Sequence, residues 1–209
     1  MIPQQPRQGG VFSGIEVRDI LIAWLGIGFA IAIALNGGIF YLGATSPAGL
    51  ALDMLVALVT VGPGFIFHEL SHKFVARHYG FWAEFRMWPQ MLGMAILISL
   101  LGFFFAAPGA TYISGFEISK EENGIISLAG PLTNAVIASL FLPLYLFGGG
   151  VLSSVGGFGL WVNIELGAFN LIPFGPLDGA KVFRWNKIIW VVALACLIIA
   201  AYFVYSAVF

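Results

Sequence analysis

The stretch that decides the fold is ILIAWLGIGFAIAIALNGGIFYL, residues 20–42, which contains no Asp, Glu, Lys, Arg or His. Its 23 residues are enough for one helical crossing of a membrane, because the hydrocarbon core is about 30 Å thick and a helix rises about 1.5 Å per residue. Uncharged apolar runs of about 18 residues or more are typical of transmembrane helices. The sequence therefore predicts an integral membrane protein.

The composition of the whole chain supports this interpretation. Of its 209 residues, 60% are hydrophobic and 9% are charged, whereas soluble domains carry about 25% charged residues. Such a chain cannot cover a water-exposed surface, which excludes a soluble enzyme and a disordered tail, and a net charge of -1 implies no nucleic-acid partner. The single cysteine, Cys196, excludes an intrachain disulfide and a cysteine-based zinc site.

Charge-free stretches locate further spans downstream of the first. We expect them at about 50–78, 124–147, 158–174 and 188–209. The glycines after residue 147 are taken to separate the third span from the fourth. No internal repeat or linker is visible, so residues 1–209 are expected to form a single membrane domain.

The segment 87–116 is ambiguous, because it can be a sixth crossing or a hairpin that dips into the membrane and returns. Its interior, AAPGATYIS, suits non-helical backbone, which is tolerated at membrane depth where it packs on protein. Lys and Arg concentrate on the cytoplasmic side of membrane proteins. Only the hairpin puts all nine bases on that side, namely Arg7, Arg18, Lys73, Arg77, Arg86, Lys120, Lys181, Arg184 and Lys187. We therefore expect five crossings, one hairpin and a cytoplasmic N-terminus, with six crossings as the alternative.

A polar motif, HELSH at residues 68–72, interrupts the second span. Residues four apart share a helix face, so His68 and His72 can bind one Zn²⁺ with the carboxylate of Glu69 beside a bound water. Zinc polarises a carbonyl and lowers the pKa of its water to about 7. A carboxylate in a membrane span is costly, which favours a functional interpretation. The structural alternative is a Glu69 that pairs with Lys73 one turn later.

A catalytic zinc usually takes a third protein ligand. The remaining histidine, His78, lies on a different helix face, which leaves the acids Glu165 and Asp178. From Met54 to His68 the helix rises about 21 Å, so the metal would lie about 9 Å from the cytoplasmic edge. Asp178 reaches that same depth in the predicted topology and is our third ligand. Glu165 lies nearer the other side, and we expect it to make a structural hydrogen bond.

Three segments together resemble the site-2 protease family of intramembrane zinc metalloproteases, in its small form without PDZ or CBS domains. They are FHELSHKFVARHYG (67–80), SLAGPLTN (127–134) and FNLIPFGPLDG (169–179), and they appear in the family's order. The resemblance implies that zinc is held by His68, His72 and Asp178 and that Glu69 is the catalytic base. It also implies that Asn170 and Asn134 position the substrate, and that 87–116 carries short β structure.

These observations predict an all-α polytopic membrane protein that works as a zinc-dependent endopeptidase, with water activated by zinc and Glu69. Its expected partners are the lipid bilayer and a transmembrane protein or peptide substrate, and its expected location is the cell membrane. Two other classes stay open. One is a transporter, in which the intramembrane acids and histidines carry protons or metal. The other is a catalytically inert relative that binds membrane helices.

Overall fold

The computed structural model describes residues 10–42, 44–104, 108–115 and 117–209. Within these residues, five helices are long and apolar enough to cross a membrane. They are α1 (Gly14–Leu35), α3 (Pro47–His78), α5 (Lys120–Phe147), α6 (Gly150–Asn170) and α8 (Lys187–Val208). The remaining elements are α2 (Ile39–Leu42), β1 (Trp82–Met87), α4 (Pro89–Ser99), β2 (Gly109–Ser114) and α7 (Asp178–Trp185). The protein is thus an all-α polytopic membrane protein with one small sheet.

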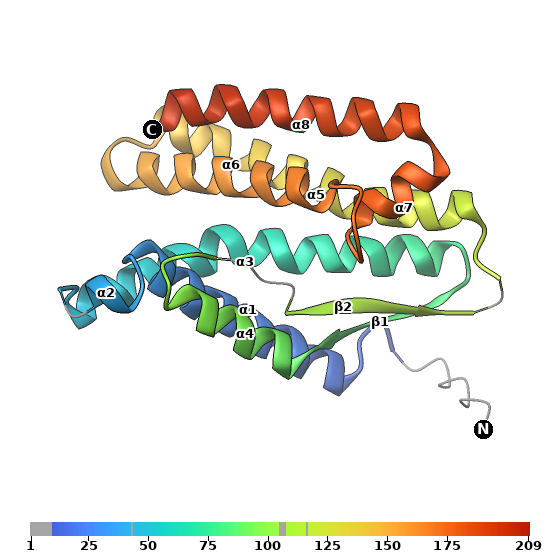
Figure 1. The fold of residues 1–209 in the computed structure, drawn as a ribbon, viewed down its shortest axis with the longest axis horizontal. Coiled ribbons are helices and arrows are strands. Elements are labelled where there is room, and N and C mark those ends of the chain that lie inside the picture. Colours follow the sequence, from blue (N-terminus) through green and yellow to red (C-terminus); the bar gives the residue numbers. More distant parts are fainter. Residues whose placement is uncertain (1–9, 43, 105–107, 116) are drawn as a thin grey trace.

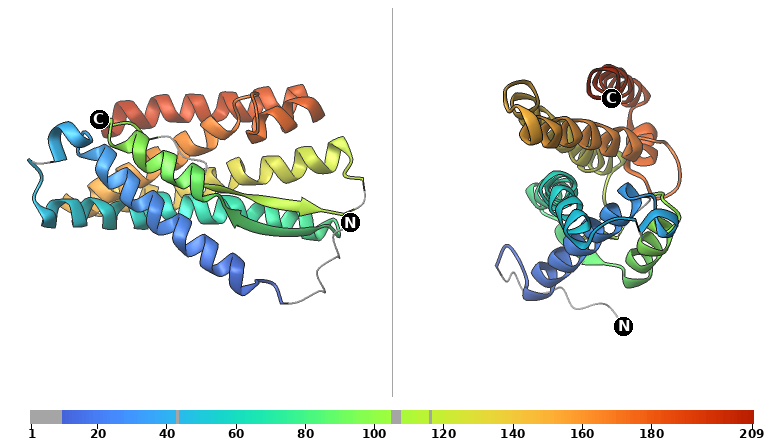
Figure 2. Two further views of the ribbon diagram at one scale, coloured as in Figure 1. Left: turned by 60° about the horizontal axis from the view of Figure 1, so that its bottom comes forward. Right: turned by 90° about the vertical axis from the view of Figure 1, so that its left-hand side faces the viewer.

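The long helices run side by side, and α3 lies between two groups of elements (Figures 1 and 2). On one side α3 packs against α1 and the sheet, and on the other side it packs against α5 and α6. Helix α8 packs against α6 and α7 at the outside of the bundle, and only 6% of its most apolar window is buried. The position of α3 at the centre places its polar motif between both groups.

The segment after α3 is a hairpin and not a sixth crossing. Strands β1 and β2 pair in antiparallel fashion, with Trp82 opposite Ser114 and Met87 opposite Gly109. Helix α4 has 11 residues, fewer than the roughly 20 that a crossing needs. The hairpin runs along α1, and beyond α4 the N–H of Ile39 donates to the carbonyl of Leu100 at 2.7 Å. The expected hairpin with short β structure is therefore present, but its first strand begins at Trp82, before the segment 87–116 in which we expected it.

The fourth span begins earlier than its glycines suggested. The sequence placed it at 158–174, whereas α6 begins at Gly150 and ends at Asn170. The turn itself falls at Gly149 and Gly150, whose φ angles are positive. Gly156 and Gly159 instead face α5, where an added Cβ would lie 2.3 Å from Tyr145 N and 2.5 Å from a Phe141 ring carbon. Small residues of this kind let membrane helices approach closely, so these glycines pack a helix and do not break one.

Candidate metal centre

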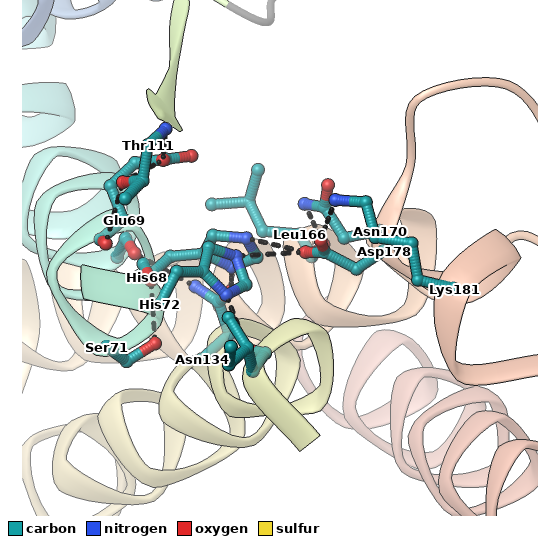
Figure 3. A network of polar contacts seen from close by, with 12 residues as sticks. His68, Glu69, Ser71, His72, Thr111, Asn134, Leu166, Asn170, Asp178 and Lys181 are labelled. Carbon is teal, nitrogen blue, oxygen red and sulfur yellow. Dashed lines mark hydrogen bonds and ion pairs between the residues drawn. The ribbon is translucent and has the colours of Figure 1, made fainter. Parts of the chain in front are cut away.

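His68 and His72 lie one turn apart on α3 and face α7. Their rings are 4.7 Å apart between centroids, and both residues are buried. Asp178, the first residue of α7, points its Oδ2 atom at the Nε2 atoms of both histidines, at 3.1 Å from each (Figure 3). The i, i+4 spacing and the turn before α7 thus bring together the two histidines and the aspartate that the sequence selected.

The other ring nitrogen of each histidine is held by an oxygen atom. Nδ1 of His72 lies 2.7 Å from the carbonyl oxygen of Ile126, which can only accept, so this nitrogen carries the proton. Nδ1 of His68 lies 2.6 Å from Oδ1 of Asn134, whose Nδ2 donates to the carbonyl of Gly64 at 3.2 Å. In a neutral imidazole held in this way, Nε2 keeps its lone pair, and this is the tautomer that binds a metal.

Two nitrogen lone pairs and a carboxylate oxygen thus converge on one point, with the three ligand atoms within 4.8 Å of one another. Acceptors that face each other in a buried site repel unless a cation lies between them. Two imidazoles and one carboxylate are also a ligand set found in catalytic zinc sites, which leave a further position open. The residues present therefore fit one zinc ion.

Two glycines make room for this arrangement. At Gly130 of α5, an added Cβ would lie 2.5 Å from Nε2 of His68 and 2.6 Å from a ring carbon of His72. At Gly179 of α7, an added Cβ would lie 2.0 Å from the carbonyl oxygen of Leu171. The first glycine lets α5 pack against the imidazoles, and the second lets α7 begin where Asp178 reaches them.

Glu69 is held by the hairpin and not by a base on its own helix. Thr111 of β2 donates to Oε2 of Glu69 from its backbone nitrogen at 3.0 Å and from its hydroxyl at 2.9 Å (Figure 3). Lys73, the partner considered in the structural alternative, instead pairs with Glu16 of α1, and both side chains are buried. That alternative is therefore wrong.

A cavity of about 160 Å³ opens beside the three ligands, and Glu69, Thr111 and Asn170 contribute to its wall. Asn170 donates from Nδ2 to the carbonyl of Leu166 at 2.9 Å. Asn134 is fully buried, and besides His68 and Gly64 it contacts Asn163 at 3.4 Å. Asn134 thus bonds to other residues of the protein. It lies on the Nδ1 side of His68, which faces away from Asp178.

Comparison with known proteins connects this site to a protein family. A protein of Methanocaldococcus jannaschii named "Putative zinc metalloprotease MJ0611" is 41% identical over 184 residues, which are 87% of this chain and 90% of that protein. A second protein of that organism, named "Zinc metalloprotease MJ0392", is 27% identical over 81% of this chain and 41% of its own length. A scan against family models found no match, and a search of the solved structures found no significant match.

The chain belongs to the site-2 protease family. This membership makes the protein a zinc metalloprotease. The cofactor of a site-2 protease is zinc, and the His68, His72 and Asp178 group can hold one ion.

Sequence reasoning missed three residues of this site-2 protease site. Ile126 contributes only its backbone carbonyl, so no side-chain pattern points to it. Thr111 lies in the short strand β2, whose sequence shows no clear periodicity, and its pairing with Glu69 spans 42 positions. Asn163 is a fully buried amide in an apolar span, and its polarity there was a signal that could have been used.

Proposed function

We propose that this protein is a zinc-dependent endopeptidase that cleaves peptide bonds within transmembrane segments of other membrane proteins. The observation that carries the proposal is the buried group of two histidines and one aspartate, with Glu69 next to it on a helix long enough to span a membrane. A site built into such a helix meets substrates that are themselves in the membrane. Regulated intramembrane proteolysis is the process that this location supports.

His68, His72 and Asp178 would hold the zinc ion. When bound, zinc supplies a Lewis acid that polarises the scissile carbonyl and lowers the pKa of a water molecule to about 7. Glu69 accepts a proton from the attacking water and delivers it to the leaving amine as the carbon–nitrogen bond breaks. Thr111 keeps Oε2 of Glu69 occupied, which leaves Oε1 for the water. Asn170, in the wall of the same cavity, positions the substrate carbonyl.

The orientation of the protein follows from its basic residues. Lys73 and Arg77 lie in the last turns of α3, and Lys120 begins α5 at the same end of the bundle (Figure 1). Arg86 lies further along β1, opposite Ala110 and so near the level of Glu69. Lys181, Arg184 and Lys187 lie at the end where α5 begins, in α7 and at the start of α8. Because bases concentrate on the cytoplasmic side, we place this end and the N-terminus in the cytoplasm. The metal centre then lies within the bilayer, nearer the cytoplasmic side.

The test compares the wild type with Glu69→Gln in lipid nanodiscs, using a labelled transmembrane peptide and zinc analysis. We expect Glu69→Gln to cleave about a hundredfold to ten-thousandfold more slowly, because a general base contributes about that much, while it keeps one zinc per chain. We expect His68→Ala and Asp178→Ala to lose the zinc as well as the cleavage. Undiminished cleavage by Glu69→Gln would contradict the assignment of the base, and unchanged zinc in His68→Ala would contradict the metal site.

A further inference from the structure

Two polar residues in the apolar span α6, Asn163 and Glu165, differ in how the fold pairs them. Glu165 makes no hydrogen bond or ion pair with any described residue, so the structural hydrogen bond that we expected for it is not found in that part of the chain. Asn163 is fully buried and forms hydrogen bonds with α3, with α5 and within its own helix. Burying an amide costs free energy unless its groups are paired, and the partners of Asn163 lead to the metal centre.

The orientation of the Asn163 amide is fixed by two backbone carbonyls. Its Nδ2 atom donates to the carbonyl of Thr60 at 3.1 Å and to the carbonyl of Gly159 at 2.8 Å. A carbonyl can only accept, and an amide nitrogen carries two hydrogens to donate, so the nitrogen and not the oxygen must face these two atoms. Oδ1 of Asn163 therefore points the other way, toward Nδ2 of Asn134 at 3.4 Å.

The same reasoning fixes the amide of Asn134. Its Nδ2 atom has two acceptors, Oδ1 of Asn163 and the carbonyl of Gly64 at 3.2 Å. Its Oδ1 atom is left to face Nδ1 of His68, at 2.6 Å (Figure 3). Because this oxygen only accepts, a neutral His68 must donate from Nδ1 and keep its lone pair on Nε2, which is the atom that faces Asp178.

Helix α3 has room for these two amides one turn before His68. Pro63 lies inside the helix, and a proline lacks the N–H of a regular turn and bends the helix. At Gly64, an added Cβ would lie 2.0 Å from Oδ1 of Asn163 and 3.3 Å from Nδ2 of Asn134. Any side chain at this position would displace the amides, so the backbone of α3 admits them only because residue 64 is glycine.

We propose that Asn163 is a positioning residue of the metal centre. It acts on the zinc ion through Asn134, because it holds the nitrogen of that amide away from His68 and so leaves an oxygen to accept from Nδ1. Without Asn163, the Asn134 nitrogen keeps one acceptor in place of two, and the amide turns over more readily and presents a donor to His68. The inference goes beyond the proposed function, because it concerns zinc binding and does not depend on a substrate.

The experiment measures zinc affinity in lipid nanodiscs, by competition with a chelator of known affinity. Asn163→Leu keeps nearly the shape of the side chain but removes its polar atoms. We expect this variant to bind zinc about twofold to tenfold more weakly, because one hydrogen bond of the Asn134 amide is lost. Ser153→Ala is the matched control, since the hydroxyl of Ser153 in α6 donates to the carbonyl of Tyr145 in α5 at 2.7 Å, near the turn between these helices. It should leave the zinc affinity unchanged.

A double-mutant cycle distinguishes positioning from a general loss of packing. In the Asn134→Leu background, Asn163→Leu should cause no further loss of zinc affinity, because the amide through which Asn163 acts is already absent. Equal losses of affinity in the two backgrounds would overturn the proposal, since Asn163 would then act by packing and not through Asn134.

The ring protons of the two histidines give a second measurement, by NMR on the zinc-bound protein. A ring N–H exchanges with water more slowly when it is hydrogen-bonded. With Asn163→Leu we expect the Nδ1 proton of His68 to exchange faster, while that of His72, which is bonded to the carbonyl of Ile126, keeps its rate. An unchanged rate for His68 would contradict the proposal. Zinc binding without cleavage of any transmembrane peptide would instead overturn the proposed function alone.

Discussion

At the scale of single residues, each imidazole of the metal group is oriented by a hydrogen bond from its Nδ1 atom. For His68 the partner is Oδ1 of Asn134. We expect Asn134→Leu to weaken zinc binding about tenfold to a hundredfold, because partners of this kind fix the tautomer and direction of a ligand. The measurement is competition for zinc with a chelator of known affinity. Asn170→Ala is the control, since Asn170 bonds to the carbonyl of Leu166 and not to a zinc-binding residue. If Asn134→Leu binds zinc as tightly as the wild type does, this role of Asn134 is refuted.

Thr111 acts at the same scale on the base and not on the metal. Its hydroxyl contacts both Oε2 and the backbone carbonyl of Glu69, at 2.9 and 3.0 Å. Thr111→Val removes the hydroxyl at nearly constant shape, and we expect kcat to fall about tenfold, as for the loss of one hydrogen bond to a charged group. KM and zinc content should not change. Thr111→Ser keeps the hydroxyl and should recover most of kcat, and a serine variant as slow as the valine variant would contradict this explanation.

At the scale of elements, the hairpin is fastened to α1 by acidic side chains. Glu16 accepts from the backbone nitrogen of Phe85 at 3.0 Å and pairs with Lys73 of α3. Asp19 accepts from the backbone nitrogen of Met87 at 3.3 Å. Because β2 pairs with β1 and carries Thr111, these contacts connect α1 to the position of Glu69.

The buried pair of Glu16 and Lys73 is therefore expected to be important for stability. The Lys73 and Glu16 side chains are 1% and 0% exposed, and removal of one partner leaves an uncompensated buried charge. We expect Glu16→Gln to lower the free energy of unfolding by about 3–5 kcal/mol, measured by denaturation in mixed micelles. The double variant Glu16→Gln with Lys73→Met should be less destabilised than Glu16→Gln alone. Additive losses would show that the two side chains do not act as a pair.

At the scale of the whole molecule, the five long helices and the returning hairpin place α3 and α5 with their first residues at opposite ends (Figure 1). The proposed orientation predicts which end faces outward. In a background with Cys196→Ser, a thiol reagent that cannot cross membranes should label Ala48→Cys in intact cells. It should label Glu117→Cys only after the cells are permeabilised. The reverse labelling pattern would contradict a cytoplasmic N-terminus.

The spans and the two histidines could be predicted from the sequence because both depend on local patterns. An apolar run long enough to cross a membrane and an i, i+4 pair on a helix need no knowledge of the rest of the chain. The bounds of two spans could not be predicted in this way. The charge-free run 20–42 is not one helix, because α1 covers Gly14–Leu35 and α2 covers Ile39–Leu42, and the bounds of α6 also differ from those expected. Whether Gly156 and Gly159 end a helix or pack one depends on the neighbour that they face, here α5.

By itself, the sequence determined that this is a polytopic membrane protein with a histidine pair and an acid at one predicted depth. The tertiary structure decided how the site is completed. Asp178 approaches His68 across 110 positions, the carbonyl of Ile126 orients His72, and Thr111 holds Glu69. These contacts depend on close packing of separate elements, with Gly130 making room for the imidazoles. Packing of this kind joins backbone atoms and distant residues, and neither leaves a periodic signal in the sequence.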